Sequence, residues 1–98
     1  MMRMELDGQV VALRPLAALE EIRLDCLGQD YAQLLHAMGL KEPDAQAVGQ
    51  NAALVFLASD LGFESPRQVL EQLSLAQLAE LASAARQVQQ GTLEGDVL

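Results

Sequence analysis

Few residues in this sequence could carry out chemistry. His36 is the single histidine, and neither a second histidine nor a cysteine pair accompanies it to complete a metal site. It lies near the end of an expected helix, where the helix dipole favours a cation, so we predict a structural role there. Cys26 is the single cysteine and falls on an apolar stripe. This position predicts a buried, inert thiol, and a lone cysteine fits a protein of a reducing compartment.

Four serines could act as nucleophiles beside His36: Ser59, Ser65, Ser74 and Ser83. Ser65 and Ser74 are each followed three positions later by a glutamine, which is the capping-box pattern of a helix start. None of the four lies in the glycine-flanked elbow typical of hydrolases. The sequence therefore predicts no catalytic residue, no metal and no cofactor, and we expect a protein that is not an enzyme.

Residues 60–65, Asp-Leu-Gly-Phe-Glu-Ser, resemble the attachment motif of acyl carrier proteins. That resemblance implies that Ser65 carries a phosphopantetheine group. Pro66 stands where the family has an aliphatic residue, and Glu64 replaces an aspartate. Helix capping by Ser65 and Pro66 explains the same residues without chemistry, so the carrier function is kept as an alternative.

Acidic residues dominate the charge, with fourteen Asp and Glu against six Lys and Arg and a net charge of −8. The sequence has no basic stripe, which argues against nucleic acid and anionic membranes as partners. Glu20, Glu21 and Asp25 cluster in the first expected helix; they form either a solvated face or a docking surface for a basic segment. The longest apolar run, residues 52–58, is far short of the ~20 residues that span a bilayer. We expect a cytoplasmic protein.

A single domain is predicted over residues 1–90, with a flexible tail over residues 91–98. Residues 3–14 are expected to form a β-hairpin, because Asp7-Gly8 favours a two-residue type I′ turn. Strand alternation then places four side chains on the face toward the helices, while Arg3 and Glu5 take the other face. The four are Met4, Leu6, Val11 and Leu13.

Helical periodicity predicts four further elements, at about residues 15–38, 43–61, 65–73 and 74–90. Gly28 predicts a kink or a break in the first helix. The expected buried stripe of that helix is Leu16, Leu19, Ile22, Cys26, Leu27, Tyr31, Leu34, Leu35 and Met38. The second helix is apolar on all sides over residues 52–58, so we expect Phe56 and Leu57 at the centre of the domain. The fold class is α+β, a hairpin packed on about four helices.

Residues 4–16 and 19–22 together look like the start of the small tail assembly chaperones of long-tailed bacteriophages. Members of that family often begin with a hairpin, a Leu-Arg-Pro-Leu type of junction and an acidic amphipathic helix. The resemblance implies a non-enzymatic protein of the host cytoplasm that binds the tape measure protein and assists assembly of the tail tube protein. A generic protein-interaction or regulatory module is the remaining alternative.

The apolar surplus of the last helix predicts a protein-binding surface, because 98 residues cannot enclose half their number as apolar side chains. We expect a helical partner segment to dock on apolar helix faces with acidic residues at the rim. The same surface is expected to support homo-oligomers. The predicted partner-binding residues are Glu20, Glu21, Asp25, Leu75, Leu78, Leu81 and Val88.

Overall fold

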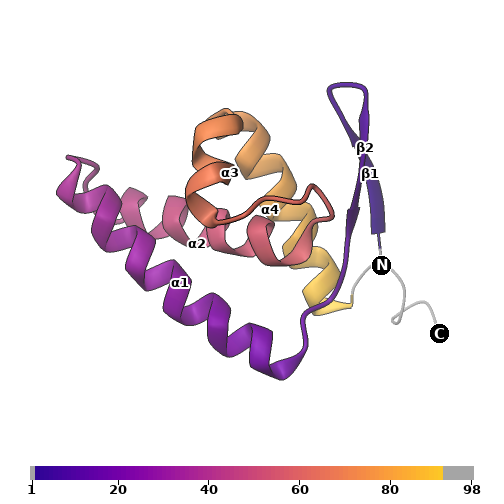
Figure 1. The fold of residues 1–98 in the computed structure, drawn as a ribbon, viewed down its shortest axis with the longest axis horizontal. Coiled ribbons are helices and arrows are strands. Elements are labelled where there is room, and N and C mark those ends of the chain that lie inside the picture. The colour runs from indigo at the N-terminus through magenta and orange to yellow at the C-terminus, as the bar shows by residue number, and fades with distance from the viewer. Residues whose placement is uncertain (1, 92–98) are drawn as a thin grey trace.

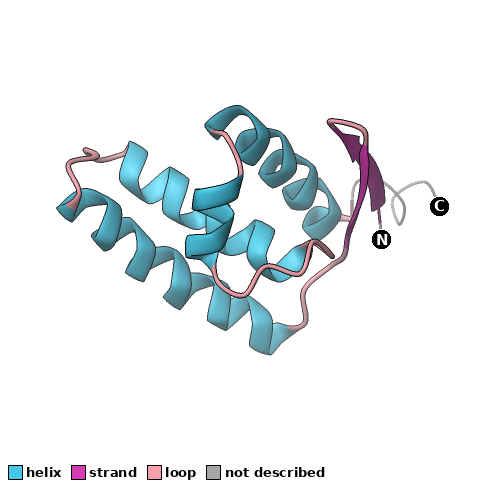
Figure 2. Cartoon of the chain, turned by 45° about the horizontal axis from the view of Figure 1, so that its top comes forward, coloured by secondary structure: helices cyan, strands magenta, loops and turns pink. Residues whose placement is uncertain are grey.

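The computed structural model describes residues 2–91 of the chain (Figures 1 and 2). Apart from Gly91, the tail predicted for residues 91–98 lies outside the described residues. The described part begins with a two-stranded antiparallel sheet and continues with helices, which confirms the predicted α+β fold. The elements are β1 (Met2–Leu6), β2 (Gln9–Leu13), α1 (Ala18–Ala37), α2 (Asp44–Ala58), α3 (Pro66–Gln72) and α4 (Leu75–Gln90).

The hairpin has the predicted turn and the predicted register. Asp7 and Gly8 both have positive φ, 51° and 83°, as a type I′ turn requires. Leu6 pairs with Gln9, and the ladder continues to Met2 and Leu13. Of the four side chains predicted to face the helices, Met4 is half-buried and the other three are buried.

The outer edge of β2 is attached to the chain that follows α2. Leu13 forms an isolated antiparallel bridge with Ser59. The N–H of Asp60 donates to the carbonyl of Ala12 at 3.1 Å, and its carboxylate accepts the Ala12 N–H at 2.9 Å. α2 therefore ends at Ala58, short of the predicted residue 61, because residues 59 and 60 are extended and pair with β2.

Helices α1 and α2 cross at glycine and alanine. A Cβ added to Gly49 would lie 2.6 Å from the backbone nitrogen of Ala32 and 3.0 Å from the carbonyl oxygen of Gly28. The two backbones are therefore in direct contact, as small residues allow at a helix crossing. α1 continues through Gly28 as one helix, so the break that was the other possibility there does not occur. The absence of a side chain at Gly28 allows α2 to approach closely.

This close crossing changes which side chains of α1 are buried. Gly28 and Ala32 are buried, while Leu19 and Ile22 are 76% and 62% exposed and Cys26 is exposed. The predicted buried stripe is therefore wrong for Leu19, Ile22 and Cys26, and so is the prediction of a buried thiol. It is also wrong for Leu34 and Met38, which are 42% and 75% exposed. The physical reason is that α1 packs through its smallest residues, which turns part of its apolar surface outward.

The core lies between α2, α4 and the hairpin. α2 packs against α1, α3 and α4, which confirms that it is the central helix. Leu57 is buried as predicted, whereas Phe56 is only half-buried, and its ring lies 5.6 Å below the guanidinium of Arg23. The fully buried large side chains are Val11, Leu13, Val55, Val69 and Leu81. Among the described helices, none is long and apolar enough to cross a membrane.

Candidate functional site

A largely apolar hollow lies where the end of α1 meets α2, α3 and the start of α4. It has a volume of about 390 Å³, and it adjoins a second hollow of about 300 Å³ that shares Leu40, Val48 and Leu75 with it. We call the joined hollows the apolar groove. Its apolar lining is Leu34, Leu35, Met38, Leu40, Ala47, Val48, Leu70, Leu75, Leu78 and Ala79.

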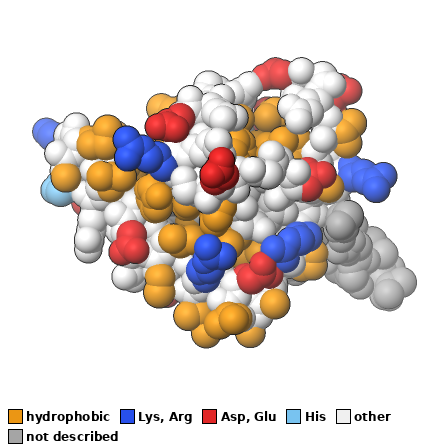
Figure 3. Space-filling model, in the orientation of Figure 1, with side chains coloured by type: hydrophobic (Ala, Val, Ile, Leu, Met, Phe, Trp, Pro, Cys, Tyr) orange, Lys and Arg blue, Asp and Glu red, His pale blue; other side chains and the backbone are white. Residues whose placement is uncertain are grey.

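Several lining residues of the apolar groove are unusually open to solvent. Met38 is 75% exposed and Leu75 is 70% exposed. Hydrophobic side chains gather at the end of the molecule where α1 ends and α2 begins (Figure 3). α3 has only seven residues, so it covers this end of the helix pair incompletely. Contiguous apolar surface of this kind on a small domain is typical of a protein-binding site.

Charged groups stand at the edge of the apolar groove. Nε of Arg67 lies 3.4 Å from a carboxylate oxygen of Glu71, one turn further along α3. Asp44 and Asn51 border the second hollow. An apolar floor with a polar rim is the usual anatomy of a protein interface.

The structure separates the residues that were predicted to bind a partner. Leu75 lines the apolar groove. Leu78, Leu81 and Val88 belong to the core, and only Leu78 touches the groove, at its floor. The prediction that Leu81 and Val88 bind a partner is wrong, because this face of α4 packs against α2 and β2.

Glu20 is bound within the chain and does not form part of a docking rim. Its carboxylate accepts two hydrogen bonds from the Arg14 guanidinium, one of them at 2.8 Å between Nη1 and Oε1, and a third from the Ala17 N–H at 3.0 Å. Arg14 also donates to the carbonyl of Leu57 at 3.1 Å. The hydrogen bonds from Arg14, followed by that from Ala17, lower the pKa of Glu20 to about 2. α1 therefore begins at Ala18, after a linker, and not at the predicted residue 15.

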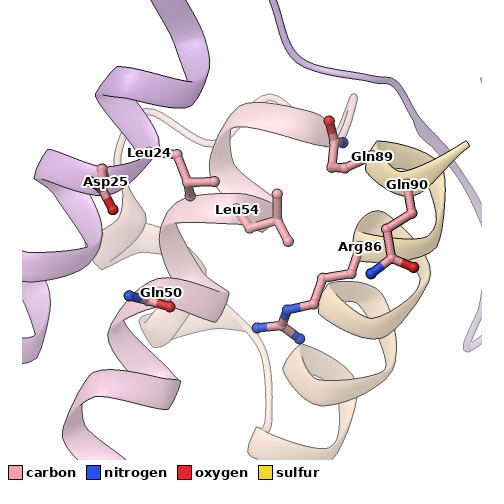
Figure 4. A pocket seen from close by; sticks show the side chains of 7 residues that line it. All are labelled: Leu24, Asp25, Gln50, Leu54, Arg86, Gln89 and Gln90. Carbon is pink, nitrogen blue, oxygen red and sulfur yellow. The ribbon is translucent and has the colours of Figure 1, made fainter. Parts of the chain in front are cut away.

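Asp25 borders a different hollow, of about 240 Å³, between α1, α2 and α4 (Figure 4). Arg86 reaches into this hollow from α4 and donates to the side-chain oxygen of Asn51. Gln89 is held by the linker before α1. Neither Glu20, Glu21 nor Asp25 lines the apolar groove. The predicted acidic rim and the predicted apolar surface are thus not one site.

Ser65 occupies the capping position predicted for it. Its Oγ accepts the Gln68 N–H at 3.4 Å, and Pro66 is the first residue of α3. The Gln68 side chain bonds the N–H of Glu64 at 2.7 Å, one residue earlier than a standard capping box requires. Within residues 2–91, no group of three or more His, Cys, Asp or Glu side chains is placed to hold a metal ion.

Most of the apolar groove is not marked in the sequence as a site. Leu34 and Met38 belong to a stripe that periodicity assigns to the core, and Leu40, Val48 and Leu70 come from three separate segments. One local feature of the sequence does indicate exposed apolar residues. Met38 and Leu40 flank Gly39, which ends a helix, so they fall outside the regular apolar stripe of that helix.

Comparison of the chain with known protein families, with curated proteins and with solved structures finds no match. The features that bear on function are therefore the apolar groove and the residues near the N-terminus.

Proposed function

We propose that this protein is a non-enzymatic assembly chaperone that binds an apolar helical segment of another protein in the apolar groove. The observation that carries the proposal is the convergence of four segments on one hollow whose large side chains remain solvent-exposed. A groove between helices receives an amphipathic helix through anchors spaced by three and four residues. Leu and Met linings adapt to different anchors, which suits a chaperone.

The partner that we propose is the tape measure protein of a long-tailed bacteriophage, with the tail tube protein as the assembly that follows. This identity rests on the resemblance of residues 4–16 and 19–22 to small tail assembly chaperones. The protein would act in the host cytoplasm and would cover apolar helical segments of the tape measure protein before the tube encloses them.

Two matched leucines allow a test of the groove. Leu75 and Leu19 both lie in the first turn of a helix, and they are 70% and 76% exposed, but only Leu75 lines the apolar groove. A glutamate in a first helical turn is compatible with the helix dipole, so both substitutions should leave the fold intact. We expect Leu75→Glu to reduce binding of a co-expressed tape measure protein at least about tenfold, since a carboxylate must then be buried in an apolar contact.

The first measurement is co-purification with the tape measure protein of the same operon. Titration of the separated components with each other then gives the dissociation constant. Leu19→Glu is the control and should bind as the wild type does. Binding should fall only modestly with added salt, because apolar contact dominates the affinity. Equal loss of binding in both variants, or no association with the tape measure protein at all, would refute the proposal.

A further inference from the structure

The outer edge of β1 presents backbone groups that nothing in the described part of the chain pairs with. In a hairpin closed by two residues, Leu6 and Gln9 form a hydrogen-bonded pair, and such pairs alternate along the ladder. Met4 and Met2 therefore bond inward to β2, while the N–H and C=O groups of Arg3 and Glu5 point outward. The same alternation turns Ala12 of β2 outward, and Ala12 does bond outward, to Asp60.

The side chains of this edge also have no ion-pair partner in the part of the chain that the structure describes. Arg3 and Glu5 are exposed, and neither forms an ion pair within the described residues. Proline, which natural sheets use to block an edge, is absent from residues 2–6. A two-stranded sheet is marginal by itself, so a further strand would stabilise it.

We propose that β1 of a second copy pairs antiparallel with this edge, so that two hairpins form one four-stranded sheet. The two-fold axis passes through Met4, which places Arg3 of each copy opposite Glu5 of the other. Arg3 and Glu5 both point their backbone groups outward, so each such pair is hydrogen-bonded. The half-buried and buried face of Met2, Met4 and Leu6 then continues from one copy to the other.

Charge selects this register from the alternatives. In a register shifted by one residue, Arg3 and Glu5 of one copy would lie opposite inward-bonded residues of the other copy, such as Met4. The N–H and C=O groups of Met4 are bonded to β2, so they could not bond across the interface. A shift by two residues would place Arg3 opposite Arg3, or Glu5 opposite Glu5. Like charges directly opposite in a sheet are destabilising, and opposite charges stabilise. Only the register centred on Met4 satisfies the backbone and both charges.

This interface is separate from the apolar groove, so the inference does not rest on the proposed function. The hairpin lies at one end of the molecule, and the end of α1 with the start of α2 lies at the other (Figure 1). Pairing through β1 would leave both grooves of the dimer open. It also differs from the expectation that self-association uses the partner-binding surface.

Charge reversal tests the pairing, with sedimentation velocity as the measurement. Arg3→Glu and Glu5→Arg each create two like-charge pairs, and each should weaken dimerisation by roughly tenfold or more. The double variant Arg3→Glu/Glu5→Arg exchanges the two charges and should restore the wild-type dissociation constant. A double variant as weak as the single ones, or a wild-type protein that stays monomeric at high concentration, would overturn the proposal.

Disulfide trapping tests the register in a Cys26→Ser background. Met4→Cys places the two thiols opposite each other in a non-hydrogen-bonded pair, where Cα atoms are about 4.5 Å apart and a disulfide can form. Arg3→Cys is the control. In the proposed register this cysteine lies opposite Glu5 of the second copy, two residues along the strand from the cysteine of that copy, which is too far for a disulfide. Mild oxidation should give a covalent dimer of the Met4→Cys chain and little of the control. Equal trapping of the Met4→Cys and Arg3→Cys chains would rule out this register. If Met4→Cys does not fold, the double variant Arg3→Glu/Glu5→Arg still decides whether the pairing occurs.

Discussion

Arg14 and Glu20 join three parts of the molecule through two side chains. Arg14 follows β2, Glu20 lies in the first turn of α1, and the Leu57 carbonyl that Arg14 also bonds belongs to the end of α2. The N–H of Ala17 completes the set of donors around Glu20. The pair therefore fixes the direction in which α1 leaves the sheet, although both side chains remain partly open to solvent.

Glu20→Gln should lower stability at neutral pH and have little effect in strong acid. The folded-state pKa of Glu20, about 2, is below its ordinary value of 4.5, so the ionised carboxylate stabilises the fold. This contribution is complete above pH 4.5 and is lost as the pH falls toward 2. Urea unfolding of wild type and variant at several pH values measures it. Glu21→Gln, at the exposed neighbouring residue, is the control and should show no such convergence.

Ser65→Ala should cost about 1 kcal/mol of stability, because the α3 start loses its side-chain acceptor. The same residue decides the acyl-carrier alternative. Incubation with coenzyme A and a broad-specificity phosphopantetheinyl transferase should leave the intact mass of the wild-type protein unchanged. A stoichiometric mass gain that Ser65→Ala abolishes would establish the carrier function instead.

At the scale of the elements, the crossing of α1 and α2 determines which surfaces remain open. Gly49 meets backbone atoms of the other helix, whereas a Cβ on Gly28 would meet the Gln50 side chain, with its Cγ at 2.9 Å. Backbone cannot move aside as a flexible side chain can. The two glycines therefore differ in what their replacement requires.

Gly49→Ala should destabilise the protein by about 1–3 kcal/mol, because overpacking at the crossing outweighs the ~1 kcal/mol that alanine gains over glycine within a helix. Gly28→Ala is the matched change. Rotation of Gln50 can relieve its contact, so its loss of stability should be clearly smaller. Chemical denaturation of both variants compares them, and a Gly49→Ala protein as stable as wild type would show that the helices separate easily.

Features set by neighbours in the sequence could be predicted, and features set by packing could not. The turn at Asp7-Gly8 and the cap at Ser65 need only a few adjacent residues, and both are present. The buried face of α1 was mispredicted because Leu19 and Ile22 outweigh Gly28 and Ala32 in any count of hydrophobicity. Only the contact with Gly49 reveals that the small residues face inward.

For the whole molecule, the candidate site follows the same division. An exposed apolar residue such as Leu75 could be predicted because the last helix has more apolar residues than one seam needs. Leu81 and Val88 could not be told apart from it by periodicity, since the burial of each depends on α2 and the hairpin. The apolar groove itself is a product of four segments meeting, and no single segment contains it.

Gln89 joins the end of α4 to the linker between β2 and α1. Its side-chain oxygen accepts the Leu16 N–H at 2.7 Å, and its amide nitrogen donates to the Arg14 carbonyl at 2.9 Å, across sequence separations of 73 and 75 residues. Contacts this distant in sequence are formed late in folding, because loop closure must precede them. During synthesis on the ribosome, the linker after the hairpin therefore cannot form its hydrogen bonds with Gln89 until almost the whole domain has been synthesised.

This order can be observed in refolding experiments. Pulse-labelled hydrogen exchange should show protection of α2 amides before that of the Leu16 N–H, and Gln89→Ala should abolish the protection of Leu16, because it removes the acceptor of that N–H. Simultaneous protection of all these amides would exclude the sequence of events. Until the domain is complete, the edge of β1 in a nascent hairpin is open to the proposed pairing with the hairpin of a neighbouring chain on the same message. Under that proposal, two copies associate before either has finished folding.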